Sequence, residues 1–390
     1  MILKGKVNYV GVNDRTKDLF ESLWPLPYGV SYNSYLIDDE KVALIDTVEV
    51  SFFQKFIKKI KGVIGDRQID YLVINHMEPD HSGSINLIRK YYPDITIVGN
   101  KKTLEMVNGF YGEPAHTLMV TDGSDLSLGH HKLRFYLTPM VHWPETMMTF
   151  DETEHILFSG DAFGSFGALN GAIVDKDMNI ARYEGEMVRY YSNIVGKYGS
   201  PVQKALAKLN KLDIEMICST HGPVWVEYKS QVIAEYNRMS LYEGNKGVVI
   251  AYGSMYGHAE EMAEIIASEL AAQGIKDIVM HDVIRTNHSY ILADVFRYKG
   301  LILGCPTYNA QLFPGMEMLL KEIASREMKN RVIGCFGTFT WAGQVGKRMC
   351  EWIEKLKFEL AGKPVENKQG VSAETIDGCR EIAKAVAEKL

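Results

Sequence analysis

The feature that most constrains the fold is a regular alternation of apolar runs and amphipathic segments in the second half of the chain. Strands are expected at 247–252, 278–283, 300–305 and 331–336. Helices are expected between and after them, at 259–272, 291–298, 315–325, 346–360 and 373–390. Parallel strands need long crossover connections, so this order predicts a doubly wound parallel sheet covered by helices on both faces.

The first half has a different pattern, with short apolar runs, polar loops and fewer helices. Strands are expected at 42–45, 71–74, 95–98, 133–137 and 156–158, and helices at 52–64, 84–92 and 202–210. This mixture predicts packed sheets with helices outside. A polar, helical connector is expected at 228–245, which places the domain boundary near Asn245 and gives domains 1–245 and 246–390.

Composition excludes several classes of protein. With 46% hydrophobic and 24% charged residues, a net charge of -6 and a pI near 6.0, the chain shows no basic stripe for nucleic acid. No run reaches the ~18 apolar residues of a membrane-spanning helix, and residues 1–6 lack the apolar region of a signal peptide. Its 5 cysteines are scattered and form no CxxC pair, which favours a cytoplasmic location without a built-in rubredoxin or zinc ribbon.

The segment from Asn75 to Gly83 holds four candidate metal ligands directly after an apolar strand: His76, Glu78, Asp80 and His81. If the segment is extended, alternate side chains point the same way, and His76, Glu78 and Asp80 converge. Pro79 keeps Glu78 out of a helical conformation. Ser82 or Ser84 is expected to cap the next helix.

Three further candidates follow apolar runs in the same way, namely His142, Asp161 and His221. Side chains at four strand ends are expected to meet at one edge of the sheets. The other histidines considered are interpreted as surface or hydrogen-bonded core residues: His130, His131, His155 and His281.

Three loops at strand ends of the second half predict a cofactor site. The first opens a helix, where backbone N–H groups can bind a phosphate, and the later two carry aromatic residues suited to a planar ring. The candidate binding residues are Ser254, Met255, Tyr256, Gly257, His258, Ala259, Pro306, Thr307, Tyr308, Asn309, Thr338, Phe339, Thr340, Trp341, Ala342 and Gly343. No GxGxxG motif is present, which disfavours NAD.

These motifs resemble known families. The first half is similar to the metallo-β-lactamase superfamily, an αββα sandwich whose motif is usually HxHxDH, but here Glu78 replaces the second histidine. Carboxylate oxygens favour iron over zinc. The HxExDH motif with a later His, Asp and His resembles the di-iron site of flavodiiron proteins. That resemblance implies one iron on His76, Glu78 and His142, a second on Asp80, His81 and His221, and Asp161 as the bridge.

Residues 246–390 resemble flavodoxin, with PTYN and GTFTWAG as ring-binding loops, which implies FMN. Flavodoxins usually carry a hydroxyl residue where Ala259 stands, so one phosphate contact is missing, and His258 or Tyr256 is a candidate replacement.

The resemblance spans the chain in the family's domain order and implies a function. Electrons pass from FMN to a di-iron centre, which reduces O2 to water or NO to N2O. An external donor is expected: rubredoxin, the reduced deazaflavin F420H2 or a flavin reductase. A head-to-tail homodimer or a tetramer is implied, and Tyr28, Trp143 and Tyr190 are expected to line the pocket.

Three alternatives remain open on the sequence: a zinc hydrolase fused to an electron-transfer flavodoxin, an electron-transfer flavoprotein with a vestigial metal site, and an oxygen sensor without turnover. The sequence does not distinguish O2 from NO, because both use the same ligands, and it does not identify the donor.

Overall fold

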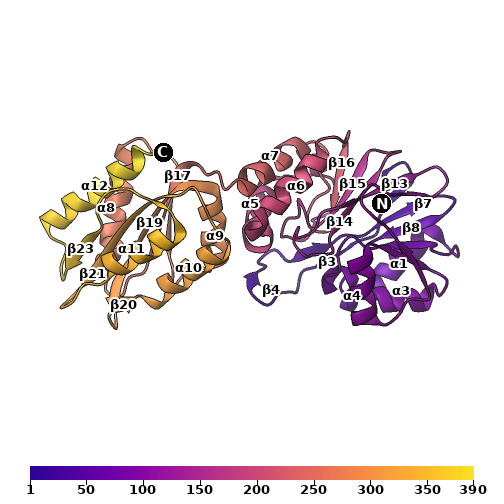
Figure 1. The fold of residues 1–390 in the computed structure, drawn as a ribbon, viewed down its shortest axis with the longest axis horizontal. Helices are drawn as coiled ribbons and strands as arrows, with labels where there is room; N and C mark the ends of the chain where they lie inside the picture. Colours follow the sequence, from indigo (N-terminus) through magenta and orange to yellow (C-terminus); the bar gives the residue numbers. More distant parts are fainter. The chain divides into compact units, whose positions relative to one another are not determined.

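The structure is a computed structural model that describes residues 1–390. The chain forms two compact units, Met1–Asn237 and Arg238–Leu390, and each is described by itself (Figure 1). The division lies within helix α7 (Lys229–Ser240), the helix predicted for the connector. The proposed boundary at Asn245 coincides with the first residue of β17 (Asn245–Tyr252).

The first unit contains two main sheets. The seven-stranded sheet, in spatial order, consists of β1 (Ile2–Lys4), β2 (Val7–Tyr9), β7 (Tyr35–Asp38), β8 (Val42–Ile45), β9 (Tyr71–Val73), β10 (Thr96–Gly99) and β11 (His116–Met119). The five-stranded sheet consists of β12 (Asp125–Ser127), β13 (Lys132–Leu137), β14 (Met147–Asp151), β15 (Ile156–Gly160) and β16 (Met216–Ser219). Two small hairpins pair β3 (Val12–Asp14) with β6 (Val30–Tyr32) and β4 (Leu19–Phe20) with β5 (Trp24–Pro25).

Helices cover these sheets on the outside. They are η1 (Val50–Phe52), α1 (Phe53–Ile64), α2 (Pro79–Ser82), α3 (Ile85–Tyr91), α4 (Lys101–Tyr111), η2 (Asp175–Asp177), α5 (Ala181–Tyr190), η3 (Tyr191–Val195), η4 (Gly196–Tyr198), α6 (Gly199–Leu209) and α7. In Figure 1, α1, α3 and α4 lie on one side of the strands and α6 and α7 on the other. Helix α1 buries Phe53, Phe56, Ile60 and Ile64, a spacing of three to four residues that places them on one face. The αββα prediction is confirmed.

The segment around the predicted metal motif differs from the prediction. Glu78 is extended, with φ -58 and ψ 139, but Pro79–Ser82 forms the short helix α2. The side chains of Asp80 and His81 therefore project from a helical turn. The expectation that the segment is extended through Asp80 is wrong. Proline at the first position of a helix fixes φ at a helical value and lacks only an N–H that the helix does not use, which explains the turn. Ser84 stands at the cap position of α3 but makes no capping bond, so the capping prediction is wrong as well.

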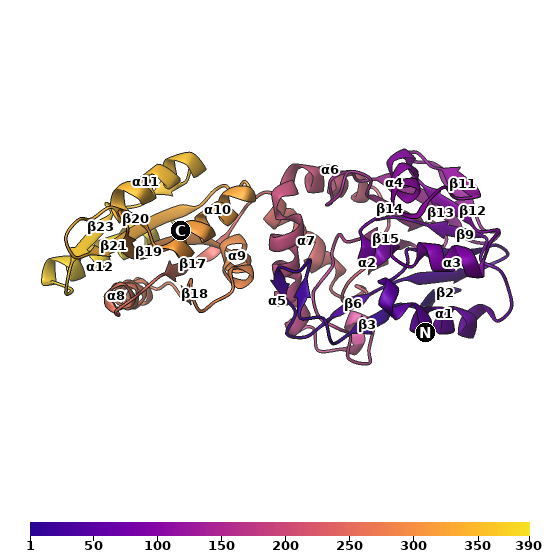
Figure 2. The same cartoon turned by 90° about the horizontal axis from the view of Figure 1, so that it is seen from below.

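The second unit is a doubly wound parallel sheet, as predicted. Its strands run in the order β18 (Ile278–Asp282), β17, β19 (Tyr298–Tyr308), β21 (Val332–Phe339) and β22 (Glu359–Leu360), with β20 (Gln311–Leu312) beside β19 and β23 (Val365–Lys368) beside β21. Its helices are α8 (His258–Ala272), α9 (His288–Arg297), α10 (Pro314–Ser325), α11 (Val345–Leu356) and α12 (Ala373–Ala387), seen around the sheet in Figure 2. The strand order reverses between β17 and β19, where a ligand crevice is expected.

Close packing at the centre of this sheet requires glycine at position 304. A Cβ there would lie 2.0 Å from Cζ of Phe336, whose ring is buried on the neighbouring strand β21. We expect Gly304→Ala to destabilise the second unit by about 1–3 kcal/mol, because overpacking moves buried side chains and backbone. The shift would appear in the calorimetric unfolding transition of this unit. Gly370→Ala is the control, since a Cβ at Gly370 meets no atom within 4 Å. Equal stabilities in the two variants would contradict this packing.

No helix of the structure combines the length and the apolar character that crossing a bilayer demands.

Candidate metal centre and flavin site

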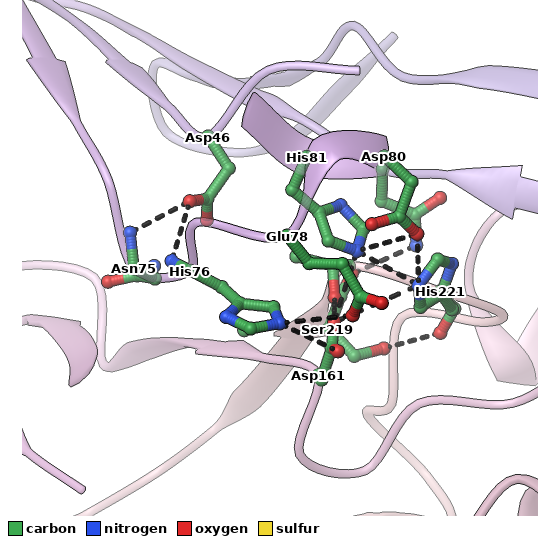
Figure 3. A network of polar contacts seen from close by, with 12 residues as sticks. Asp46, Asn75, His76, Glu78, Asp80, His81, Asp161, Ser219 and His221 are labelled. Atoms are coloured by element: carbon green, nitrogen blue, oxygen red, sulfur yellow. Dashed lines mark hydrogen bonds and ion pairs between the residues drawn. The ribbon is translucent and has the colours of Figure 1, made fainter. Parts of the chain in front are cut away.

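Seven histidine and carboxylate side chains meet in the first unit where strands of both sheets end. His76 follows β9 in the seven-stranded sheet, and Asp161 and His221 follow β15 and β16 in the five-stranded sheet. His142 lies in the loop between β13 and β14, and Glu78, Asp80 and His81 come from α2 and the residue before it. All seven sequence candidates are brought together, and most of them are labelled in Figure 3.

The approach to the first ligand is fixed by a buried carboxylate. Asp46, which follows β8, accepts hydrogen bonds from the backbone N–H groups of Asn75 (2.8 Å) and His76 (3.3 Å), as Figure 3 shows. These bonds hold the chain at the end of β9 and direct the His76 side chain toward the other ligands.

The first cluster contains His76, Glu78, His142 and Asp161. Oε2 of Glu78 lies 3.3 Å from Nε2 of His76 and 3.2 Å from Nε2 of His142. Oδ2 of Asp161 lies 3.4 Å from Nε2 of His76 and 3.0 Å from Nε2 of His142. Four potential ligand atoms therefore converge on one point.

The second cluster contains Asp80, His81 and His221. Oδ2 of Asp80 lies 3.3 Å from Nε2 of His81 and 3.2 Å from Nε2 of His221. The other oxygen of Asp161, Oδ1, lies 3.1 Å from Nε2 of His81 and 3.8 Å from Nε2 of His221. Asp161 thus offers one oxygen to each cluster, the arrangement of a bridging carboxylate.

The contacts fit metal ions better than they fit a hydrogen-bond network. Nε2 of His81 and Nε2 of His221 face each other at 2.9 Å, and neither oxygen of buried Asp80 accepts a hydrogen bond. Ligand atoms about 2.1 Å from a tetrahedral ion are separated by roughly 3.4 Å, close to the distances seen here. Two imidazoles with carboxylate oxygens in each cluster suit iron better than the three-histidine sets of catalytic zinc.

The raised pKa values of the buried histidines also indicate a pocket that favours cations. Burial alone would lower the pKa of His76, yet the carboxylates around it, led by Asp161, raise that pKa well above its usual value. His81 and His142 are likewise buried, and their carboxylate neighbours raise each pKa to about 9. The carboxylates of this pocket therefore favour positive charge, which metal ions can supply.

Further residues support the ligands from outside. Oε1 of Glu145 lies 2.9 Å from Nδ1 of His76 and accepts the Met77 N–H at 2.9 Å. The Thr220 hydroxyl donates to Asp161 Oδ1 at 2.5 Å, and Nδ1 of His221 lies 2.7 Å from the Ser31 carbonyl oxygen. Sequence reasoning missed these partners. Of these partners, only Glu145 could have been found from the sequence, because it lies three residues after the candidate ligand His142.

Aromatic side chains pack against a histidine of each cluster. The Trp143 ring lies 5.3 Å from the His76 ring, and the Tyr190 ring lies 5.4 Å from the His221 ring. The Tyr190 hydroxyl is buried without a hydrogen bond, and burial followed by the charges of Asp161, Glu78 and Asp80 raises its pKa well above the usual value. Tyr28 is half exposed, and the Arg182 guanidinium lies 5.0 Å from its ring.

Glu21 is a further residue that the sequence did not indicate. It sits at the turn of the β4–β5 hairpin with φ 48, an unusual conformation for a residue other than glycine. Its carboxyl accepts the Trp24 Nε1–H at 3.0 Å. Burial and the charge of Glu78 raise the pKa of Glu21 to about 7. The Glu21 carboxyl is therefore near enough to Glu78 for the two charges to interact.

The remaining histidines behave as interpreted. Nδ1 of His131 lies 2.7 Å from Asp151, Nε2 of His281 lies 2.9 Å from Asp294, and Nδ1 of His155 lies 2.9 Å from the Asp213 carbonyl oxygen. His130 is exposed.

The second unit has a cavity of about 620 Å³ at the carboxyl ends of its strands, the expected crevice. It is lined by Ser254, Met255, Tyr256, His258, Ala259, Pro306, Thr307, Tyr308, Asn309, Ala310, Thr338, Phe339, Thr340, Trp341, Ala342 and Gln369. Of the predicted binding residues, only Gly257 and Gly343 are not in the lining, while Ala310 and Gln369 were not predicted. Trp341 and Tyr256 are 89% and 88% exposed, so both rings are free to contact a ligand.

Comparison with known proteins agrees with both sites. Residues 30–222 match the family described as ODP family beta lactamase, and residues 250–382 match flavodoxin. The anaerobic nitric oxide reductase flavorubredoxin of Escherichia coli O1:K1 / APEC is 30% identical, over 100% of this chain and 82% of that protein.

Two solved structures resemble the whole chain. Rubredoxin oxygen:oxidoreductase from Desulfovibrio gigas matches with a TM-score of 0.94 at 28% identity, over 100% of this chain and 98% of that chain. The flavodiiron protein from Giardia intestinalis matches with a TM-score of 0.93 at 26% identity, over 98% and 95%.

A lactamase-like domain with a paired metal site, followed by a flavodoxin domain, defines a class of two-domain metalloflavoproteins. Within that class, the chain belongs to the flavodiiron protein family. The family resemblance of the sequence is confirmed.

Proposed function

We propose that this chain is a flavodiiron oxidoreductase, which takes electrons from an external donor onto FMN and reduces O2 to water, NO to N2O, or both. The observation that carries the proposal is Asp161, whose two oxygens complete two separate clusters in one buried pocket. The names of the relatives agree, since one is a nitric oxide reductase and another an oxygen oxidoreductase.

The ligand assignment follows the two clusters. His76, Glu78 and His142 would hold one iron, Asp80, His81 and His221 the other, and Asp161 would bridge them. A pair of ferrous ions held by these residues would supply two electrons, and reduced FMN would supply two more, which together are the four that reduction of O2 to water requires.

The protein around the ligands shapes the pocket. Phe20 and Phe166 pack against Tyr190, and Phe20 also lies 5.3 Å from His221, so this side is apolar and excludes water. The Tyr190 hydroxyl is buried without a hydrogen-bond partner, so it is available to hydrogen-bond a small polar ligand. Trp143 covers His76 edge-on and fixes its ring.

A zinc hydrolase fused to a flavodoxin is the alternative. Glu78 argues against it, because this carboxylate takes the place of a third imidazole in the first cluster. The deciding assay measures O2 and NO consumption by the purified protein with a reduced donor, alongside hydrolysis of esters and β-lactams. Hydrolysis without gas consumption, in a preparation supplied with iron, would contradict the proposal.

The proposed function also requires an electron donor and a second chain. Rubredoxin, F420H2 and a flavin reductase are the candidate donors, and rubredoxin is favoured by the name of the Desulfovibrio relative. A head-to-tail homodimer, or a tetramer of two such pairs, would bring the flavin of one chain to the metals of another. The 5 free cysteines, of which all but Cys350 are buried, agree with the reducing conditions of the cytoplasm.

The support of His76 by Glu145 gives a testable prediction. We expect Glu145→Gln to weaken metal binding in the first cluster by about 10–100-fold, because a neutral amide orients and polarises the imidazole less well than a carboxylate. The second cluster should keep its affinity. Chelator competition at the two sites measures both values. Asp294→Gln is the control, since Asp294 partners His281 in the other unit. Unchanged affinity in Glu145→Gln would show that this contact does not support the metal.

A further inference from the structure

The loop that would receive the FMN phosphate has an unusual composition. Five residues of this loop line the cavity, namely Ser254, Met255, Tyr256, His258 and Ala259, and only Ser254 has an aliphatic hydroxyl group. The oxygen of this hydroxyl already accepts the Gly257 N–H at 3.1 Å. Gly257 precedes α8 with φ 95 and gives no side-chain cap. The first N–H groups of α8 have no intrahelical partner, so they are free for a phosphate.

The charge around this loop is unfavourable for a dianion. A phosphate monoester carries about -1.5 to -2 charges at neutral pH. The first turn of α8 holds Glu260 and Glu261, and the cavity lining contains no lysine or arginine. His258 is the one lining side chain that can carry a positive charge.

His258 is also well placed to act. It is the first residue of α8, it lines the cavity, and its side chain is 47% exposed. Its charged neighbour is Glu261, whose Oε2 lies 3.9 Å from Nδ1. Glu260 is turned to Tyr252, whose hydroxyl donates to it at 3.1 Å. The cavity lining also contains the phenol groups of Tyr256 and Tyr308.

We propose that His258 is a phosphate-binding residue of the FMN site, that its imidazole takes up a proton when FMN binds, and that it replaces the hydroxyl contact absent at Ala259. This inference rests on the proposed FMN site. An imidazole exchanges its proton between pH 5 and 8, and a phosphate dianion stabilises the charged form. FMN affinity therefore falls as the pH rises through that range. Riboflavin, which lacks the phosphate, gains nothing from the proton.

The test uses the full-length chain freed of flavin. Dissociation constants for FMN and riboflavin are measured by quenching of flavin fluorescence at pH 6.5, 7.5 and 8.5 and constant ionic strength. The variant is His258→Asn, which keeps a polar group but carries no charge. His116→Asn is the control, because His116 is exposed on β11 in the other unit.

For the wild type and His116→Asn, we expect the FMN dissociation constant to rise about tenfold from pH 6.5 to 8.5, because binding is linked to proton uptake. In His258→Asn, FMN should bind about tenfold more weakly at pH 6.5, with little pH dependence, and riboflavin should bind all three proteins alike. An equal pH slope in His258→Asn, or an equal loss of riboflavin binding, would overturn the role of His258 while leaving the FMN site intact. Failure of wild-type protein to bind FMN at any pH would overturn the proposed function as well.

Discussion

Replacing Asp161 by alanine is expected to remove both irons and to reduce O2 and NO turnover to background. Oδ2 of Asp161 belongs to the first cluster and Oδ1 to the second, so the variant loses a ligand atom at each site. It also leaves four imidazoles facing each other with one carboxylate fewer to offset the two cations. Iron per chain, measured by elemental analysis beside flavin absorbance, should fall from two toward zero while FMN stays bound.

Two companion variants make this result specific. His221→Ala should weaken only the second site. His221 belongs to the second cluster, and its carboxylate contacts are with Asp80 and Asp161, not with Glu78 of the first cluster. Asp151→Ala removes another buried aspartate of the same sheet, the partner of His131, and should cost about 1–3 kcal/mol of stability while leaving the iron content unchanged. Retention of two irons by Asp161→Ala would show that this carboxylate does not bridge the metals.

Mixing two inactive variants is expected to restore turnover, because electrons should pass between chains. The flavin and metal sites lie in separate units of one chain. The first variant lacks metal ligands (Asp80→Asn with His142→Ala), and the second disrupts the flavin site (Trp341→Ala with Ser254→Asp). In a mixed head-to-tail dimer, one interface pairs the intact flavin unit of the first variant with the intact metal unit of the second.

Random exchange makes half of the dimers mixed, and each has one of two interfaces intact, so activity should reach about a quarter of the wild-type value. Exchange is verified by mass spectrometry of differently labelled chains. Proven exchange with no recovery would mean that electrons travel within a single chain.

The sequence predicted which side chains come together better than it predicted their local geometry. Each of the seven side chains follows or adjoins an apolar run, and this signal is local and readable. The turn of α2 was missed because Pro79 was taken as a helix breaker for Glu78, whereas it also starts a helix for Asp80 and His81. Glu21, Glu145 and Thr220 were missed because their contacts join segments far apart in sequence.

In the second unit, the end of one helix was predicted wrongly. A helix was predicted over 346–360, but α11 ends at Leu356 and β22 follows at Glu359–Leu360. Lys357 adopts a left-handed conformation with φ 56, a helix stop usually marked by glycine. No glycine or proline signals this end, so periodicity alone extended the helix. The strands at residues 2–38 were missed because all of them are only two to four residues long.

The most direct test of the account is an anaerobic titration of the fully reduced protein with O2, followed by stopped-flow absorbance and a parallel titration with NO. Protein loaded with two irons and one FMN per chain stores four electrons, two on iron and two on the flavin. We expect about one equivalent of O2 per chain to reoxidise both flavin and iron without hydrogen peroxide, because four electrons reduce O2 to water. Reoxidation of the flavin alone with stoichiometric hydrogen peroxide, or a preparation grown with iron that contains only zinc, would contradict it.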